Sequence, residues 1–274
     1  MPEMPEVETI RRELEEKVKG EEITKVEVRS AKPLKNATVE EFTDVVEGAT
    51  IEDVKRRGKI LIINLSAGYS LLIHLKLTGR ILYQIANAPM EKHTHVIFSL
   101  DDHQLRFWDQ RQFGYIKVFK TEDLPNAPEV KELGPEAMGE DFILEVFQKL
   151  LQTRKKGPIK PLLMDQNFIA GVGNVYADEA LYYAGVQPTR IVSSLSRGEI
   201  AKIYEGIRRI LPAALEYRGS SVDLYVDIYG RQGEYVPYLK AYGREGEPCE
   251  RCGTPIRKIT LRGRGAHFCP KCQK

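Results

Sequence analysis

The four cysteines of this 274-residue chain all lie within its last 26 residues. Cys249 and Cys252 are separated by two residues, sixteen residues follow, and Cys269 and Cys272 repeat the first spacing. Two C-x2-C pairs at this separation are typical of a four-thiolate zinc site. Four protein ligands complete a tetrahedral zinc ion and leave no position for a substrate. We therefore expect one Zn2+ ion with a structural role.

The residues between the two cysteine pairs predict a hairpin with the basic tip Arg262-Gly263-Arg264-Gly265 and with Lys258 on its first strand. Arginine and lysine on a rigid hairpin suit phosphate contact or groove entry. Any one of them could equally serve only to keep a small module soluble. The set favours a polyanion, because the last 26 residues hold seven Lys or Arg and one Glu (+6), while the whole chain sums to +2 and the remainder therefore to −4.

The amino terminus, MPEMPEVE, places a proline at position 2 beside the carboxylates Glu3, Glu6 and Glu8. The ordinary interpretation is a helix start, where proline and acidic residues are favoured by capping and by the helix dipole. A chemical alternative exists, because removal of Met1 would leave Pro2 with a free secondary amine. An α-amino group with a pKa of roughly 8 is partly nucleophilic at neutral pH and can form an iminium with a sugar carbon. Glu3 is placed to move protons beside it.

A glycine-rich turn, AGVGN, ends at Asn174 and leads into a helical pattern. Asn174 is predicted as the N-cap of that helix, and the glycines would let backbone amides approach an anion. A purely structural helix hairpin would use the same turn. The upstream residues Lys155, Lys156 and Lys160 favour a phosphate, since they would border the same face.

Composition excludes several classes of protein. With 42% hydrophobic and 29% charged residues, and no run near the roughly 20 apolar residues of a membrane span, the chain is neither disordered nor membrane-embedded. The amino terminus lacks the basic start and apolar run of a secretion signal. We expect a reducing, cytoplasmic location, where cysteines serve as metal ligands more often than in disulfides.

The elements that would hold these groups fall into two regions. Residues 5–19 predict a helix that Gly20 ends, and residues 22–120 hold short runs typical of an antiparallel sandwich or barrel, uninterrupted by a helix. These runs are ITKVEV, KILIINL, SLLIHLKL, RILYQI, THVIFSL, QLRFW and YIKVF.

Residues 121–139 read as a connection to a helical region. The helical patterns there are DFILEVFQKLLQT, PIKPLLMDQ, NVYADEALYYAG and a long helix after Ser196, which forms a capping box with Glu199. The buried stripe of that long helix is Ile200, Ile203, Ile207 and Leu211. Residues 217–237 are irregular, and we expect a mobile loop.

Taken together, the motifs closely resemble the bacterial formamidopyrimidine-DNA glycosylase family from end to end. The resemblance is carried by MPEMPEVETIRR, RRGK (56–59), HLKLTGR (74–80), KHTHV (92–96), DQRQFG (109–114), IKPLLMDQ, GVGNVYADEAL and YGREGEPCERCGTPI with the terminal cysteine pair. It implies an α+β multidomain fold. Residues 1–132 would form a catalytic antiparallel β-sandwich with flanking helices, 133–245 a helix-two-turns-helix DNA-binding domain, and 246–274 a zinc-finger hairpin. Residues 217–237 would be the loop that closes over the extruded base.

The implied activity is that of a bifunctional enzyme, which removes oxidised purines such as 8-oxoguanine and formamidopyrimidines and then cuts the abasic strand by β,δ-elimination. The resemblance implies the following roles: Pro2 attacks the sugar C1′, Glu3 donates a proton during ring opening, Glu6 positions the amine, Lys59 assists base release and β-elimination, and Arg264 contacts phosphates and takes part in δ-elimination. On spacing alone, Lys59 would be a surface charge beside Lys55-Arg56-Arg57.

A base must leave the stack before C1′ can be reached, so the gap must be filled. The resemblance assigns this to Arg111, which would read the orphaned cytosine, to Phe113 as a wedge, and to Leu77, where methionine is usual. Without the resemblance, Phe113 would be read as sandwich core. Phosphate contacts are implied for His74, His93, Lys155, Asn174, Tyr242 and Lys258. Met4 replaces the customary leucine, and RGSS (218–221) replaces a double glycine with Ser or Thr.

The implied partner is double-stranded DNA that contains oxidised bases or abasic sites, bound by a monomer in the bacterial cytoplasm and nucleoid. Two alternatives stay open. An endonuclease VIII-type glycosylase for oxidised pyrimidines would share the fold, but Arg111-x-Phe113 and the PEVETIRR helix speak against that branch. A non-catalytic zinc-finger DNA-binding protein would use the helix turn and the hairpin alone.

Overall fold

The computed structural model describes residues 1–274, which divide into two compact units. The N-terminal unit comprises Met1–Lys131 and Arg218–Glu234, and the C-terminal unit comprises Glu132–Tyr217 and Tyr235–Lys274. No helix in the chain has the length and apolar character needed to span a bilayer. The N-terminal unit is thus built from two separate stretches of sequence.

The N-terminal unit begins with helix α1 (Met4–Val18), which confirms the predicted first helix to within one residue at each end. Glu3 and Glu6 form a reciprocal capping box at its start, and Gly20, at φ 86°, follows its C-cap. The face of α1 that carries Val7, Ile10, Leu14 and Val18 is buried in the unit's core.

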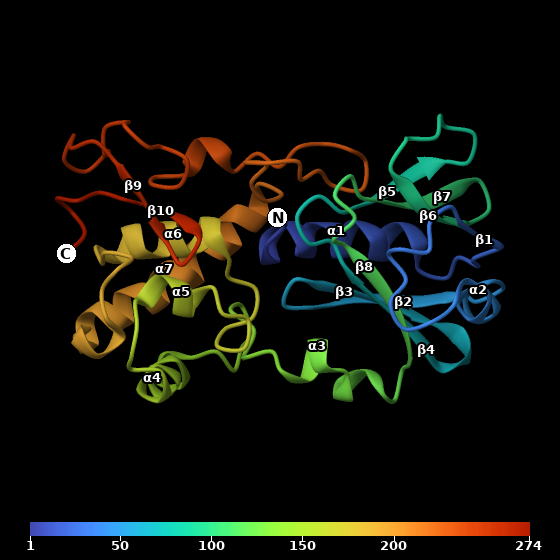
Figure 1. Ribbon diagram of the computed structural model, residues 1–274, viewed down its shortest axis with the longest axis horizontal. Helices are drawn as coiled ribbons and strands as arrows, with labels where there is room; N and C mark the ends of the chain where they lie inside the picture. The colour runs from blue at the N-terminus through green and yellow to red at the C-terminus, as the bar shows by residue number, and fades with distance from the viewer. The chain divides into compact units, whose positions relative to one another are not determined.

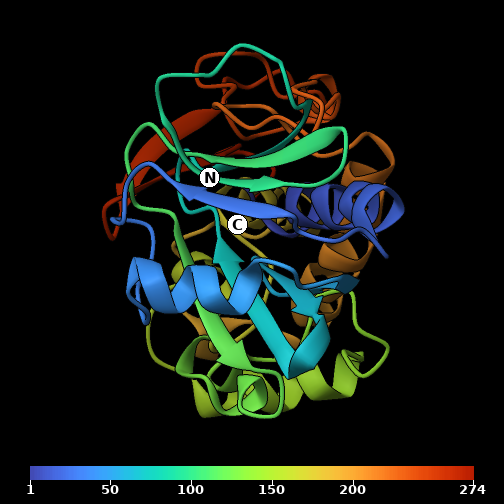
Figure 2. The same cartoon turned by 90° about the vertical axis from the view of Figure 1, so that its right-hand side faces the viewer.

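Two four-stranded antiparallel sheets form the body of this unit, with strand orders β1-β6-β7-β5 and β2-β3-β4-β8. Figure 2 shows one sheet above the other. The strands are β1 (Lys25–Val28), β2 (Ile51–Arg57), β3 (Ile60–Leu65), β4 (Tyr69–His74), β5 (Arg80–Ile85), β6 (Thr94–Ser99), β7 (His103–Trp108) and β8 (Tyr115–Lys120). All seven predicted runs form strands, and the expected antiparallel sandwich is confirmed.

Two elements of this unit differ from expectation. Helix α2 (Val39–Val46) interrupts the strands, whereas no helix was predicted there. Thr38 caps it and forms a capping box with Glu41. These side-chain hydrogen bonds define the start of the helix, which has only two buried apolar residues, Phe42 and Val46. Strand β2 was also missed, because only Ile51 and Val54 of IEDVKRR are buried. Short helical turns complete the unit: η1 (Ser66–Gly68), η2 (Leu124–Asn126) and α3 (Pro128–Lys131).

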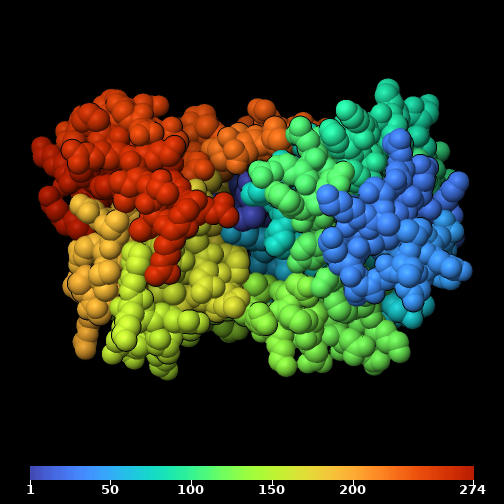
Figure 3. All heavy atoms as spheres, viewed as in Figure 1, coloured from blue at the N-terminus to red at the C-terminus, as the bar shows by residue number.

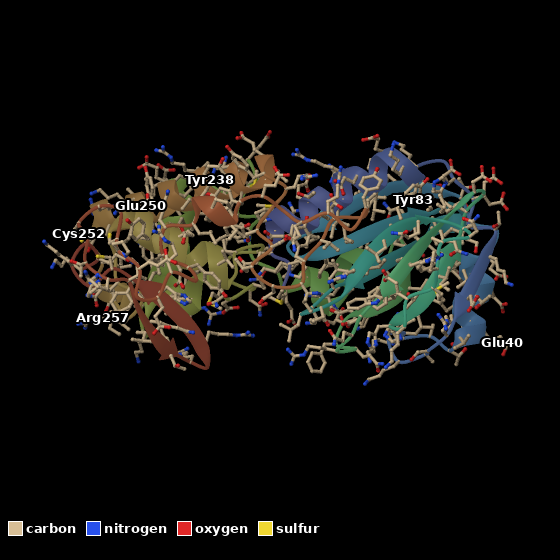
Figure 4. The ribbon with its side chains drawn as sticks, turned by 90° about the horizontal axis from the view of Figure 1, so that it is seen from above. Glu40, Tyr83, Tyr238, Glu250, Cys252 and Arg257 are labelled. Atoms are coloured by element: carbon tan, nitrogen blue, oxygen red, sulfur yellow. The ribbon has the colours of Figure 1, made fainter.

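The segment Arg218–Glu234 is irregular and is tied to α1 and β5 of the same unit. Tyr83 on β5 donates its backbone N–H to the Ile228 carbonyl at 2.8 Å. Arg231 pairs with Glu13 of α1 at 2.9 Å and with Asp227 at 2.7 Å. Tyr83, labelled in Figure 4, also meets the Tyr229 ring edge-on at 6.5 Å. These contacts hold the segment in one conformation although it contains no helix or strand.

The C-terminal unit is helical, as predicted. Its helices are α4 (Leu144–Thr153), α5 (Ile159–Leu163), α6 (Asn174–Ala184) and α7 (Arg197–Glu216), with the short turns η3 (Val192–Ser194) and η4 (Val236–Tyr238). The Ser196–Glu199 capping box at the start of α7 is confirmed. The buried stripe of α7 includes Ile203, Ile207 and Leu211, while Ile200 is only partly buried.

A two-stranded hairpin, β9 (Arg257–Leu261) and β10 (Arg264–Phe268), ends this unit. Few apolar side chains pack beside the hairpin, and the local core around Tyr182, Cys249 and Ile256 is completed by the other three cysteines. In Figure 1 the hairpin lies across α6 with its tip toward α5. Such a small core needs a metal ion to be stable.

Candidate active site and nucleic-acid interface

The amino-terminal cluster is formed by the start of α1 and by the segment Arg218–Glu234. Pro2 is buried, and Glu3 is 3% exposed. The Glu6 carboxylate holds both chain segments, because Oε2 accepts the Glu3 backbone N–H at 2.7 Å and Oε1 accepts that of Ser220 at 2.7 Å. The helix-capping and chemical interpretations of these acids are therefore compatible. The same Glu6 carboxylate caps α1 and holds Ser220 of the segment Arg218–Glu234.

Gly219 is required by this arrangement. Its φ is 80°, in the left-handed region, and a Cβ placed there would lie 2.6 Å from Glu6 Oε1. Only glycine combines that backbone conformation with such a close approach. RGSS therefore keeps a glycine where the Glu6 carboxylate comes closest.

Lys59 lies in the two-residue turn between β2 and β3 and is 5% exposed, so the surface-charge interpretation is wrong. Gly58, at φ 55°, takes the first turn position, as in a type II′ hairpin. Arg56 donates to the Gly58 carbonyl at 2.8 Å and to Glu8 of α1 at 3.0 Å. Burial acts to raise the pKa of Glu8, but hydrogen bonds from its arginine neighbours, Arg56 first, lower it on balance. The lysine turn is thus braced against the helix that carries Pro2.

His74, at the end of β4, is a neutral imidazole. Burial, then the positive charges of Lys76 and Lys59, lowers its pKa to about 3. Nδ1 accepts the Lys76 backbone N–H at 3.1 Å, which leaves the proton on Nε2. His74 can therefore donate one hydrogen bond to an oxygen but brings no charge to it.

The three residues expected to fill the gap in DNA all belong to the N-terminal unit. Phe113 is 52% exposed, so it is not sandwich core. The Arg111 guanidinium lies 4.9 Å from the centre of the Phe113 ring. Leu77 is partly buried in the turn after β4, and His93 meets Trp108 edge-on at 5.6 Å. An exposed aromatic ring under a cation is suited to contact with bases.

Lys160 differs from expectation, because its charge is buried in an ion pair and is not presented at the surface. Its side chain is 1% exposed and its Nζ lies 2.7 Å from Asp178 Oδ1. The same Nζ donates to the Gly265 carbonyl at 2.5 Å, and Asp178 Oδ2 accepts the His267 backbone N–H at 2.9 Å. Lys160 and Asp178 thus secure the hairpin to α5 and α6 next to the exposed Arg264.

A cavity of about 180 Å³ lies at the hairpin tip, lined by Lys160, Pro161, Met164, Asp165, Leu261, Arg262 and Arg264. Figure 3 shows the hairpin tip, in red, projecting over the yellow-green residues of this unit. Because Lys160 is engaged by Asp178, the cations that this cavity offers to a phosphate are Arg262 and Arg264.

The other predicted phosphate contacts of the C-terminal unit come from separate elements. Asn174 is the first residue of α6 and not its N-cap, which is Gly173; its buried Oδ1 has no hydrogen-bond partner. Lys155 is exposed after α4, and Lys258 is exposed on β9. The Tyr242 ring packs against His267 at 4.9 Å. Gly173 removes the Cβ at the helix start, where free N–H groups favour an anion.

The four cysteines converge at the end of the hairpin opposite its tip. Their Sγ atoms lie within 4.8 Å of one another, for example 4.0 Å for Cys249–Cys272 and 3.5 Å for Cys252–Cys269. Zn–S bonds of about 2.3 Å place tetrahedral sulfurs about 3.8 Å apart, so the set fits one zinc ion. Figure 4 shows Cys252 far from the hairpin tip. The ion would therefore support the hairpin and not take part in chemistry at the tip.

Three family profiles match the chain in succession. They are the formamidopyrimidine-DNA glycosylase N-terminal domain over residues 1–116, its H2TH domain over 133–226, and the zinc finger found in FPG and IleRS over 246–274. The chain belongs to the formamidopyrimidine-DNA glycosylase family. The predicted fold class and the structural zinc site are thereby confirmed.

Full-length relatives agree with this assignment. The formamidopyrimidine-DNA glycosylases of Pelotomaculum thermopropionicum and Carboxydothermus hydrogenoformans are 46% and 44% identical, covering 100% of this chain and 99% and 100% of theirs. Wild-type Lactococcus lactis Fpg, solved with DNA that contains N7-benzyl-Fapy-dG, superposes with a TM-score of 0.93 at 37% identity over 100% of both chains. The same enzyme with abasic-site DNA gives 0.93 at 36% over 99% of both.

Within this formamidopyrimidine-DNA glycosylase fold, Pro2, Glu3 and Glu6 lie together, while Leu77 lies on a different turn of the same unit from Arg111 and Phe113. Sequence reasoning missed Asp178 and Asp109, both 0% exposed. Neither stands out in sequence, since each has another polar residue directly beside it, in ADEA and DQRQ. Their importance comes from burial and from partners distant in the chain.

Proposed function

We propose that the chain is a bifunctional DNA glycosylase and abasic-site lyase that excises oxidised purines, such as formamidopyrimidines and 8-oxoguanine. Membership of the family over the whole chain carries this proposal, and the buried Pro2-Glu3 pair supports it. Its substrate is DNA with damaged bases or abasic sites. The protein acts as a monomer in the bacterial cytoplasm.

The proposed chemistry starts at the Pro2 nitrogen. Its lone pair attacks C1′ as the bond to the damaged base breaks, and the N–H proton of the amine passes to the departing base. Glu3 then donates a proton to O4′ as the C1′–O4′ bond opens to the iminium. Glu6, which bonds to both Glu3 and Ser220, holds the amine in place. Lys59 assists base release and β-elimination, and Arg264 assists δ-elimination at the second phosphate.

We propose the division into a catalytic domain (1–132), a helix-two-turns-helix domain (133–245) and a zinc finger (246–274). Arg111, Phe113 and Leu77 would fill the gap left by the extruded base. His74, His93, Lys155, Asn174, Tyr242 and Lys258 would contact phosphates. Residues 217–237 would close over the base, and their bonds to Glu6 support that placement.

The decisive experiment compares two forms of the protein. While Met1 is attached, the Pro2 nitrogen is a tertiary amide and cannot attack a sugar, so only the form without Met1 should react. Intact mass defines each preparation, and borohydride trapping on duplex DNA with 8-oxoguanine opposite cytosine measures the Schiff base. We expect a trapped adduct with the processed form alone. An equal yield from a form that retains Met1 would exclude Pro2 as the nucleophile.

A secondary activity on oxidised pyrimidines is favoured by one observation. The wild-type Lactococcus lactis enzyme has also been solved with DNA that contains an oxidised pyrimidine, at 36% identity and a TM-score of 0.93. We propose that the present chain cuts such lesions more slowly than 8-oxoguanine. Parallel incision of 8-oxoguanine and thymine glycol duplexes tests this order, and faster cutting of thymine glycol would reverse the assignment.

A further inference from the structure

Three motifs that carry proposed DNA-contacting residues meet at one residue, Asp109, which is 0% exposed. The motifs are HLKLTGR (74–80), KHTHV (92–96) and DQRQFG (109–114). They follow three different strands, β4, β5 and β7, and no motif directly follows another in the chain. Their meeting point lies inside the N-terminal unit.

The Asp109 carboxylate accepts hydrogen bonds from two of these motifs. Oδ1 accepts from the Thr78 hydroxyl and from the Arg111 backbone N–H at 3.1 Å, and Oδ2 accepts from the Gly114 backbone N–H at 2.7 Å. The Arg111 N–H also lies 3.1 Å from Thr78 Oγ1. One carboxylate therefore closes the turn that bears Arg111 and Phe113 and bonds it to the turn that bears Leu77.

The backbone of Asp109 holds the third motif. Its N–H donates to the His93 carbonyl at 3.0 Å, and its carbonyl lies 2.8 Å from His95 Nε2. His95 is 5% exposed, so this contact is also inside the unit. Asp109 thus connects all three segments through five of its neighbours.

Two glycines in the turns around this carboxylate have no room for a Cβ. A Cβ on Gly114 would lie 2.9 Å from Phe107 Cζ and 3.0 Å from Asp109 Oδ2, and one on Gly79 would lie 2.4 Å from the Leu75 carbonyl oxygen. Gln112 adopts φ 55°, a left-handed conformation that non-glycine residues rarely take. Hydrogen bonds on both sides of Gln112, at Arg111 and Gly114, hold that conformation.

We propose that Asp109 is a positioning residue that fixes Leu77, Arg111 and Phe113 relative to one another before DNA binds, and that selectivity for the base opposite the lesion depends on it. This inference rests on the proposed glycosylase function. A wedge that is already rigid does not have to be ordered during base extrusion, and Arg111 faces the orphaned base at a set position.

Asp109→Asn tests the proposal with a side chain of the same shape. All three side-chain contacts are donors, so an amide must direct its NH2 group at one of them and lose that bond. Thr78→Val is the second variant, because it removes the hydroxyl without changing the size of the side chain. Thr78→Ser is its matched control, because it keeps the hydroxyl.

The experiment compares two substrates in single-turnover reactions with Met1-free protein. Duplex 8-oxoguanine opposite cytosine or adenine requires the wedge, whereas a single-stranded abasic site has no gap to fill and no opposite base. We expect Asp109→Asn and Thr78→Val to slow duplex excision about 10- to 100-fold and to reduce the preference for cytosine. Trapping on the single strand should stay within about twofold of wild type, and Thr78→Ser should match wild type on both substrates.

The proposal is overturned if both variants keep the duplex rate and the base preference. It is equally overturned if a folded variant loses duplex and single-strand activity together, since that pattern indicates a general effect on catalysis and not one on the wedge. Failure of the proposed function itself would look different, because wild-type protein would then give no trapped adduct on either substrate. Should Asp109→Asn not fold, the pair Thr78→Val and Thr78→Ser decides the question.

Discussion

Replacement of Lys160 by methionine should destabilise the C-terminal unit. Lys160 and Asp178 are 1% and 0% exposed, and their charged atoms lie 2.7 Å apart. Methionine has nearly the length of lysine and no charge, so it fills the site without an ion. The change leaves Asp178 Oδ1 buried with no cation, and it removes the donor that Lys160 supplies to the Gly265 carbonyl.

Removal of one partner from a buried ion pair costs about 3–5 kcal/mol, because the other charge stays buried without compensation. Asp178 Oδ2 keeps the His267 backbone N–H at 2.9 Å and the ring nitrogen at 3.1 Å. We therefore expect the lower end of that range, about 3 kcal/mol. The double variant Lys160→Met/Asp178→Asn has neither charge and should recover about 2 kcal/mol of the loss.

The position of the single tryptophan gives this measurement an internal control. Trp108 belongs to the N-terminal unit, so its fluorescence in urea follows that unit alone. Far-UV circular dichroism follows the helices of both units, of which α4 to α7 of the C-terminal unit form the larger share. Lys160→Met should shift the urea transition seen by circular dichroism and leave the transition of Trp108 fluorescence in place. A loss below about 1 kcal/mol, or strictly additive effects in the double variant, would refute the reasoning.

Four further outcomes are expected. Gly219→Ala should lower stability by more than Gly230→Ala does. Both glycines are left-handed, at φ 80° and 81°, but only at Gly219 would the new Cβ collide with Glu6. Equal shifts in melting temperature would contradict this. Because the pKa of His74 is lowered to about 3, the unfolded chain binds its proton below about 6.5 while the folded chain does not. Stability should therefore fall as the pH drops from about 6.5 toward 3, by at most about 1.4 kcal/mol per pH unit, and His74→Gln should flatten the profile of urea midpoint against pH. Removal of zinc by a chelator should abolish DNA binding in a mobility-shift assay and leave Trp108 fluorescence unchanged, since the cysteines and Trp108 lie in different units. Arg264→Ala should weaken DNA binding and strand cleavage while zinc, measured by atomic absorption, stays bound; loss of zinc would indicate a structural role for this exposed arginine.

Much of the fold was predictable where side chains repeat with a clear period or spacing. The seven strands found from sequence are runs of apolar residues, and the cysteine spacing specified the zinc hairpin. Strand β2 was missed because IEDVKRR places only two apolar residues inward and leaves its charges on the outer face. Helix α2 was missed although Thr38 and Glu41 stand at capping-box spacing, which was a readable signal.

The candidate site was less predictable, because its organisation depends on burial and on distant partners. The lysine at 160 looked like a member of a basic cluster, yet its carboxylate partner is on the next helix and its carbonyl partner is 105 residues away. The N-cap of α6 was predicted one residue too late in the chain, at Asn174, whereas Gly173 caps the helix. Single-residue spacing does not distinguish an N-cap from the first helical residue.

The discontinuity of the N-terminal unit affects how the protein is made. Its second stretch, Arg218–Glu234, is separated from its first by the 86 residues 132–217. At roughly 5–20 residues per second, a ribosome needs on the order of ten seconds to synthesise that interval. Throughout it the edge of β5 lacks the Ile228 carbonyl, and Glu6 lacks Ser220. The nascent amino terminus is therefore open to methionine removal before Arg218–Glu234 has been synthesised. Translation thus separates the maturation of Pro2 in time from the bond between Glu6 and Ser220.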